Sequence, residues 1–241
     1  MEQRKLLERE LNILRDRLLL MGGEVELALQ RAMHALLQRD SEVANQVLEG
    51  DRVIDQLELE IDRMSVELLT LRRPVARELR MVISISKITP ILERIADHAT
   101  SIARAAIELN DEPETTIFGD FNEMAECATE MLQAALDIFT SNDSEKARQL
   151  IARDAELDAI YDRLFANLMD TMSQQDGAKS TRLARLMFVA KHLERIGDYV
   201  KDICELTVYM KEAVFIKHQQ WFWILDFGFW IEQENKFKIH I

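Results

Sequence analysis

A six-residue sequence occurs twice in this chain, and the repeat constrains the fold more than any other feature of the sequence. Residues 92–97 read Leu-Glu-Arg-Ile-Ala-Asp, and residues 193–198 read Leu-Glu-Arg-Ile-Gly-Asp. Five of the six positions are identical, which indicates an internal duplication. In a chain of 241 residues, the duplication favours two structural units of about 100 residues each.

Both copies of the repeat lie in segments with the hydrophobic periodicity of an α-helix. The apolar positions recur at steps of three and four: Ile85, Ile88, Ile91, Ile95, Ala99, Ile102, Ala106 and Leu109 in the first segment, and Val189, Ile196, Val200 and Ile203 in the second. Glu93 and Asp97 therefore lie one turn apart, nearly opposite this apolar stripe. Glu194, Asp198 and Asp202 repeat the arrangement, so each half is expected to present stacked carboxylates away from its own core.

The rest of the chain is also patterned as helices. Seven Gly and three Pro leave few turns, which indicates long helices and little sheet. We expect helices over residues 4–39, 41–71, 75–109, 121–140, 143–174 and 179–213, with Ser41 as the N-cap of the second. Pro90 lies inside the third helix and should kink it. The expected fold class is all-α, with three helices at residues 1–110, a linker at 111–120 and three helices at 121–214.

A second column of carboxylates accompanies the repeat in each half. Asp51 and Asp55 lie four residues apart on the second expected helix, and Asp154 and Asp158 do so on the fifth. Carboxylates on adjacent helices can ligate hard, oxygen-preferring cations. With 43 acidic residues in the chain, about seven acidic pairs at this spacing are expected by chance, and such pairs are solvated faces. Recurrence at equivalent places in both halves is what favours a metal site.

Composition and motifs disfavour most other functions. A formal net charge of −13 disfavours nucleic acid and anionic membranes as partners and favours proteins or cations. Cys127 and Cys204 have no zinc-type spacing and are interpreted as buried residues of a reduced compartment. The sequence contains no phosphate-binding Gly-rich loop, His-Glu-x-x-His or Gly-x-Ser-x-Gly motif, so we expect no enzyme. Its start lacks a secretory signal and no apolar run could span a membrane, which predicts a cytoplasmic protein.

Two histidines lie within or beside the repeat. His98 follows Asp97, but the second half has Tyr199 at the equivalent place, which argues against a required metal ligand. His192 falls on the apolar stripe of its helix, and we expect it to be a core residue.

The C-terminal segment, residues 215–241, does not follow the helical pattern. It holds all three Trp of the chain and eight of its sixteen aromatic residues, in no clear register. The interpretations left open are a tail that docks on a membrane surface or a partner, a patch packed on the body of the protein, and an aberrant end unrelated to the domain.

Several segments, taken together, resemble the PhoU family of phosphate-signalling regulators. They are residues 193–199, residues 92–98, the run Arg-Pro-Val-Ala-Arg-Glu-Leu-Arg at 73–80, and Met-Gly-Gly-Glu-Val-Glu at 21–26. They occur in order, and the resemblance extends over about residues 5–214. It implies two pseudo-symmetric three-helix bundles in tandem, usually associating as a homodimer.

The resemblance also implies multinuclear metal clusters on the bundle surfaces. Iron is the favoured metal, and zinc, manganese and magnesium stay open. In the family the ligands come from Glu/Asp-x-x-x-Asp motifs. The matching positions are Asp51 with Asp55 and Glu93 with Asp97 in the first half, and Asp154 with Asp158 and Glu194 with Asp198 in the second, which Asp202 extends.

The activity that the resemblance implies is regulation without catalysis. Such a protein represses the phosphate-starvation response and modulates phosphate uptake, linking the ATPase subunit of a phosphate ABC transporter to a sensor histidine kinase. It would meet the membrane only through these partners. Two alternatives stay open: a carboxylate-bridged metal-binding protein with a storage or redox role, and a structural dimer whose carboxylates are merely solvated. Pro90 and the aromatic tail depart from the family pattern.

Overall fold

The computed structural model describes residues 2–112, 119–174 and 177–216, and these residues form six α-helices and no strand. The helices are α1 (Glu2–Gln38), α2 (Ser41–Arg72), α3 (Arg77–Asn110), α4 (Gly119–Ser141), α5 (Ser144–Ser173) and α6 (Ala178–Glu212). The all-α prediction is confirmed, and the expected helix bounds differ from the observed ones by at most two residues. Six of the ten residues of the predicted linker, 113–118, lie outside the described ranges.

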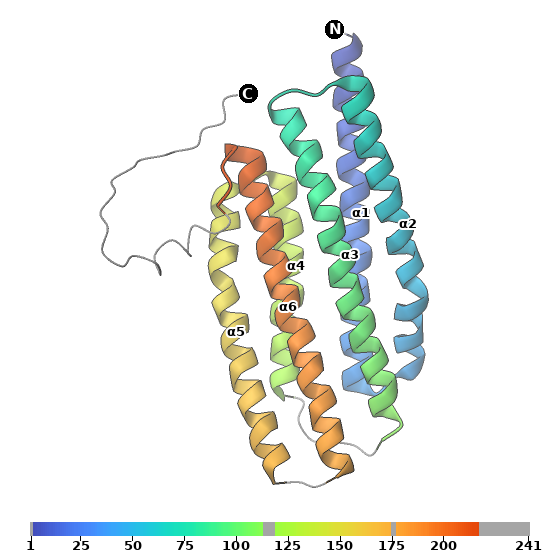
Figure 1. The fold of residues 1–241 in the computed structure, drawn as a ribbon, viewed down its shortest axis with the longest axis vertical. Helices are drawn as coiled ribbons and strands as arrows, with labels where there is room; N and C mark the ends of the chain where they lie inside the picture. The colour runs from blue at the N-terminus through green and yellow to red at the C-terminus, as the bar shows by residue number, and fades with distance from the viewer. Residues whose placement is uncertain (1, 113–118, 175–176, 217–241) are drawn as a thin grey trace, which may run out of the picture.

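The six helices form two bundles that lie side by side (Figure 1). Helices α1, α2 and α3 pack against one another, as do α4, α5 and α6, so the order of packing repeats in the two halves. The bundles meet mainly where α3 packs on α6, and α1 also contacts α4. Gly22 of α1 makes the second contact close, because a Cβ there would lie 2.7 Å from Leu136 Cδ2 of α4.

The second helix of each bundle begins at the same kind of cap. Asp40 Oδ1 accepts hydrogen bonds from the backbone N–H groups of Glu42 and Val43, at 3.0 and 3.1 Å. Asp143 caps α5 through the same pattern of bonds. The expectation that Ser41 is the N-cap is therefore wrong. A carboxylate has charge as well as an acceptor oxygen to offer the positive helix end, and Ser41 is the first helical residue.

Helix α3 continues through Pro90 as one helix. A proline inside a helix removes one backbone hydrogen bond but does not end the helix when both flanks are packed. Here the flanking residues Ile88, Thr89, Ile91 and Leu92 are all buried. Pro90 thus lies in the middle of a helix that the surrounding core holds in place.

The start of the linker is tied to both bundles. Arg39, at the end of α1, donates hydrogen bonds to the backbone carbonyls of Asn110, at 2.7 Å, and Glu112. The Glu112 carboxylate forms ion pairs with Arg182, at 3.0 Å, and Arg185, at 2.5 Å, both on α6. Where the chain leaves the first bundle, it is therefore already bound to the second.

The two cysteines are buried and free, as the sequence analysis expects. Burial raises the pKa of the Cys204 thiol to about 12, and burial likewise raises the pKa of Cys127. The C-terminal segment is described only as far as Ile216, so the expectations for residues 217–241 lie outside the described ranges. None of the described helices combines the length and apolar character that crossing a membrane requires.

Candidate functional site

Six carboxylates of α2 and α3 form what we call the first cluster: Asp51, Asp55, Glu58, Asp62, Glu93 and Asp97. Their charges act on one another across the two helices. The pKa of Asp51 is raised by burial and then by the charges of Asp55 and Asp97. The pKa of Glu58 is raised by burial and by Asp62, Asp55 and Asp97. The structure thus brings together the two predicted motifs of the first half, and it adds Glu58 and Asp62 to them.

Glu93 bears the largest effect within the first cluster. Burial raises its pKa to about 7, and the charges of Asp97, Glu58 and Asp55 and a hydrogen bond with Asp97 act in the same direction. A glutamic acid normally loses its proton near pH 4.5. Near neutral pH, Glu93 is therefore only about half ionised.

None of the ion pairs among the described residues involves a carboxylate of the first cluster. Arg63 of α2 pairs with Glu67, and Arg17 of α1 pairs with Glu60. Arg104 acts on Asp51 only at longer range, where it lowers the pKa of that carboxyl less than the acidic neighbours raise it. Closely spaced carboxylates without a paired base attract cations, and oxygen donors suit hard metal ions. The residues of the first cluster therefore fit a metal ion or cluster.

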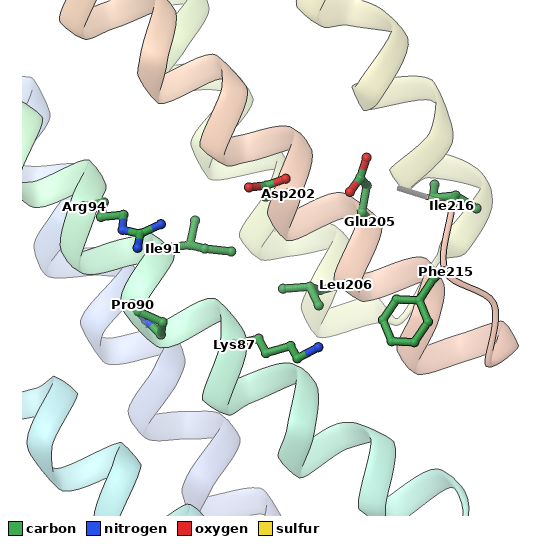
Figure 2. A pocket seen from close by; sticks show the side chains of 9 residues that line it. All are labelled: Lys87, Pro90, Ile91, Arg94, Asp202, Glu205, Leu206, Phe215 and Ile216. Carbon is green, nitrogen blue, oxygen red and sulfur yellow. The ribbon is translucent and has the colours of Figure 1, made fainter. Parts of the chain in front are cut away.

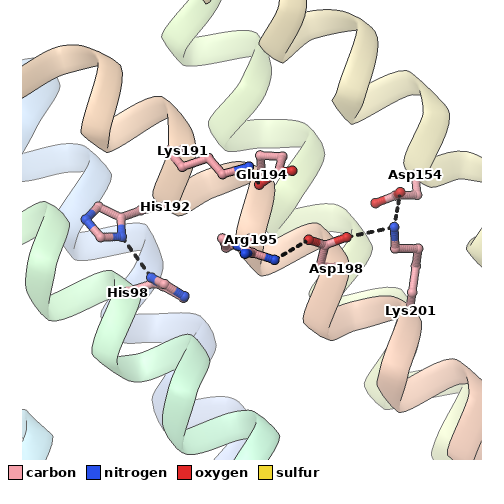
Figure 3. A network of polar contacts seen from close by, with 8 residues as sticks. All are labelled: His98, Asp154, Lys191, His192, Glu194, Arg195, Asp198 and Lys201. Carbon is pink, nitrogen blue, oxygen red and sulfur yellow. Dashed lines mark hydrogen bonds and ion pairs between the residues drawn. The ribbon is translucent and has the colours of Figure 1, made fainter. Parts of the chain in front are cut away.

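Five carboxylates of α5 and α6 form the equivalent second cluster: Asp154, Asp158, Asp162, Glu194 and Asp198. Basic side chains of α6 pair with three of them (Figure 3). Lys201 Nζ lies 2.5 Å from Asp154 Oδ2 and 2.8 Å from Asp198 Oδ1. Arg195 pairs with Asp198 at 3.2 Å, and Lys191 pairs with Glu194 at 2.7 Å. The second cluster is thus largely neutralised by its own chain.

The pKa values of the second cluster reflect this pairing. Burial alone would raise the pKa of Asp198, but hydrogen bonds from Lys201 and Arg195 bring it below the usual value. Burial alone would lower the pKa of Lys201, but its hydrogen bonds with Asp154 and Asp198 raise it instead. Burial keeps the pKa of Asp154 raised despite the lysine. The lysine and Asp198 are therefore charged at neutral pH.

Asp154 lies inside the second bundle, with 6% of its surface exposed. Asp154 is the one buried carboxylate among the predicted ligands, and its burial sets it apart from the partner column of the first half. Gly197 explains the difference, because a Cβ there would lie 2.9 Å from Asp154 Oδ1 and 2.5 Å from Leu157 Cδ2. The missing side chain lets α5 approach α6 closely enough to enclose Asp154. The periodicity of a single helix contains no information about such an approach.

Asp202 lies apart from the second cluster, in a pocket between the bundles (Figure 2). The pocket has a volume of about 260 Å³. Its lining consists of Lys87, Pro90, Ile91 and Arg94 of α3, Asp202, Glu205 and Leu206 of α6, and Phe215 and Ile216. Lys87 Nζ lies 5.2 Å from the centre of the Phe215 ring, which stacks on Tyr209. The pocket joins acidic, basic and apolar side chains of both halves.

The two histidines that the sequence analysis considered separately lie in contact across the bundle interface. His98 Nδ1 of α3 is 2.8 Å from His192 Nδ1 of α6 (Figure 3). The His98 ring also stacks on Tyr199. Burial lowers the pKa of His98 to about 4 and also lowers that of His192. His192 is half-buried between the bundles, so the expectation that it is a core residue is wrong. The pairing depends on how α3 and α6 pack, which neither helix encodes alone.

The carboxylates of the described residues are not drawn together around a single point. In the described ranges, no group of three or more His, Cys, Asp or Glu side chains has the arrangement of a formed metal site. The predicted ligands instead lie in two clusters, one without ion pairs among the described residues and one paired with Lys201. Sequence reasoning missed this lysine, although its position seven residues after Glu194 places it on the same helix face.

Comparison with protein families and known relatives agrees with the resemblance in both halves. The PhoU domain family matches residues 18–106 and 121–207. The chain is 35% identical over 208 residues to a phosphate-specific transport system accessory protein PhoU homolog of Clostridium acetobutylicum, covering 86% of this chain and 94% of that protein. It is 32% identical to the phosphate-specific transport system accessory protein PhoU of Escherichia coli, covering 87% and 86% respectively.

Solved structures share the fold as well. The crystal structure of PhoU from Pseudomonas aeruginosa superposes with a TM-score of 0.82 at 36% identity, covering 86% of this chain and 99% of that one. PhoU from Streptococcus pneumoniae, a phosphate transport system regulatory protein, superposes with a TM-score of 0.80 at 28% identity, covering 87% and 99%. The repeated motif, the two three-helix bundles and these matches lead to one conclusion: the chain belongs to the PhoU family.

Proposed function

We propose that this protein is a non-catalytic regulator of a phosphate-specific transport system. It links the ATPase subunit of a phosphate ABC transporter to a sensor histidine kinase, and it represses the phosphate-starvation response when phosphate is plentiful. The observation that supports this most directly is membership of the PhoU family across both halves of the chain. Both partners present their soluble parts to the cytoplasm, which is where the proposal places this protein.

The charge of the molecule supports protein partners with basic surfaces. The chain has a formal net charge of −13, and charge complementarity speeds association and selects partners. The ATPase subunit and the kinase would meet the acidic surface through patches of Lys and Arg.

The first cluster is the proposed metal site, with Asp51, Asp55, Glu93 and Asp97 as ligands. A multinuclear cluster, of iron in the first instance, would replace the proton that Glu93 holds. Bound metal would supply positive charge that bridges carboxylates of α2 and α3. The cluster would thereby change the charge of the surface that a partner meets.

We also propose a homodimer, formed through an apolar stripe on α1. Its residues recur every seventh position and are 37–46% exposed: Leu6, Ile13, Leu20 and Leu27. Seven-residue spacing of apolar side chains is the pattern by which one helix packs along another. A second copy is the occupant that fits, because a twofold axis brings the same stripe of both chains together.

The proposed function is tested in a host that lacks its own regulator of this kind and carries a phosphate-starvation reporter. In phosphate-rich medium, the intact chain should reduce reporter output by at least tenfold. A variant with Glu93→Gln and Asp97→Asn should lose most of this repression. The matched control, Glu49→Gln with Asp111→Asn, removes the same charge from exposed positions of the same half and should repress normally.

Pull-down experiments with the same proteins complete the test. The intact chain should capture the transporter ATPase and the kinase. If it captured neither and left the reporter on, the adaptor function would be refuted. A metal-storage or redox protein would instead change cellular metal content or oxidise its metal, with no effect on the reporter.

A further inference from the structure

The two carboxylate clusters lie on equivalent helices of the two bundles but differ in their ion pairs. Three of the five carboxylates of the second cluster pair with basic side chains of α6: Lys191, Arg195 and Lys201. Six carboxylates of the first cluster form no ion pair in the described part of the chain. The unpaired carboxylates therefore gather in the first cluster.

Lys201 occupies the place between the helices that a bridging cation would need. Its Nζ contacts Asp154 of α5 at 2.5 Å and Asp198 of α6 at 2.8 Å. Carboxylates of two helices converge on this one ammonium group, as Figure 3 shows. A metal ion that bridged Asp154 and Asp198 would have to displace the lysine and leave its charge half-buried beside another cation.

The repeat shows what the first half has instead. When residues 92–97 are aligned with residues 193–198, Lys201 corresponds to Thr100 and Lys191 corresponds to Pro90. Thr100 is buried, and its hydroxyl donates to the backbone carbonyl of Asp97 at 2.9 Å. Pro90 lines the pocket between the bundles. Neither residue brings a positive charge to Glu93 or Asp97.

We infer that Lys201 is the built-in cation of the second cluster, and that this cluster takes up no metal ion in the intact chain. The second motif is then a structural ion-pair network that joins α5 to α6. The contrast between the two clusters rests on the metal binding proposed above for the first cluster. That binding is tested separately from the assignment of Lys201.

The test uses the full chain, stripped of metal with a chelator and titrated with Mn²⁺ by calorimetry, with bound manganese measured by elemental analysis. The variant with Glu194→Gln and Asp198→Asn should bind as much Mn²⁺ as the intact chain. The variant with Glu93→Gln and Asp97→Asn should lose the Mn²⁺ binding that the intact chain shows. If the second-cluster variant lost as much manganese as the first-cluster variant, the assignment of Lys201 would be overturned.

Removing the lysine charge gives the complementary test. In the chain already carrying Glu93→Gln and Asp97→Asn, which should bind no Mn²⁺, Lys201→Thr should create measurable Mn²⁺ binding. Lys201→Met, which keeps the length of the side chain, should do the same if the threonine variant folds poorly by circular dichroism. Lys211→Thr, an exposed change on the same helix, should have no effect.

The two proposals fail in different ways. If the intact chain bound no Mn²⁺ but the Lys201 variants did, the first cluster would lose its proposed role and the assignment of Lys201 would stand. If folded Lys201 variants gained no binding, Lys201 would not be what keeps metal out, and the assignment would fall.

Discussion

Glu93 shows how strongly one side chain depends on the charges around it. In the folded protein its pKa is about 7, against 4.5 for an ordinary glutamic acid. The folded state therefore binds more protons than the unfolded chain between these two pH values. By linkage, the stability of the metal-free protein must fall as the pH rises from about 4.5 to 7, and it stays lower above that range.

We therefore expect Glu93→Gln to stabilise the metal-free protein at pH 8 but hardly at pH 4.5. After allowance for solvent screening, the gain at pH 8 is on the order of 1 kcal/mol. Urea denaturation in the presence of a chelator measures it at both pH values. Glu49→Gln, an exposed change on α2, provides the control and should have no such pH dependence. An equal effect of Glu93→Gln at both pH values would contradict the prediction.

At the scale of helices, two glycines differ in the space around them. One lies where two helices pack closely, and the other lies in open space. Gly197 lies where α6 meets α5, and a Cβ there would come within 2.5 Å of Leu157. Gly23, in the middle of α1, has no neighbouring atom within 4 Å of such a Cβ. The same substitution should thus have opposite effects at the two sites.

Gly197→Ala is expected to destabilise the protein by about 1–2 kcal/mol, because overpacking outweighs the gain in helix propensity. Gly23→Ala should stabilise it by up to ~1 kcal/mol, since only the helix propensity changes. Chemical denaturation of both variants measures the two free energies. Stabilisation by Gly197→Ala would show that α5 and α6 can separate without cost.

At the scale of the whole molecule, α1 presents its apolar stripe to the outside of the first bundle. Leu20, near the middle of the stripe, is 46% exposed. A charge at this position would lie in the proposed dimer interface, where burying it without a partner is costly. Its effect on a monomer would be small.

Leu20→Glu should therefore convert the dimer into a folded monomer. Analytical ultracentrifugation should give half the mass of the intact protein, with unchanged helical content by circular dichroism. Leu59→Glu, which changes an exposed leucine of α2 outside the stripe, should leave the mass unchanged. A dimer that survived Leu20→Glu would place the interface elsewhere.

The helices could be predicted from the sequence because the apolar periodicity that indicates each helix lies within its own residues. The three- and four-residue steps of apolar residues located all six within two residues of their bounds. The N-cap of α2 was misplaced by one residue, because Asp40 and Ser41 are both good caps and only the backbone shows which one stands outside the helix. The all-α class follows from the same local pattern.

The charges of the candidate site could be predicted only in part. Spacing within one helix gives the pairs Glu93 with Asp97 and Glu194 with Asp198, and it also places Lys191, Arg195 and Lys201 three residues from Glu194 or Asp198, but the contact of Lys201 with Asp154 forms between α6 and α5. The burial of Asp154 requires the gap at Gly197, and the contact between His98 and His192 requires the packing of α3 on α6. The hydrophobic periodicity of a single helix carries no information about contacts that form between two helices.

The buried thiols have a practical consequence for watching this molecule at work. Only the thiolate reacts with maleimide reagents, and the raised pKa values of Cys127 and Cys204 leave very little thiolate at neutral pH. Cysteines introduced at exposed positions would therefore take up fluorescent dyes selectively, with both native residues retained. Energy transfer between dyes on α2 and α5 could then report in real time whether the two bundles shift when a cation or a partner arrives.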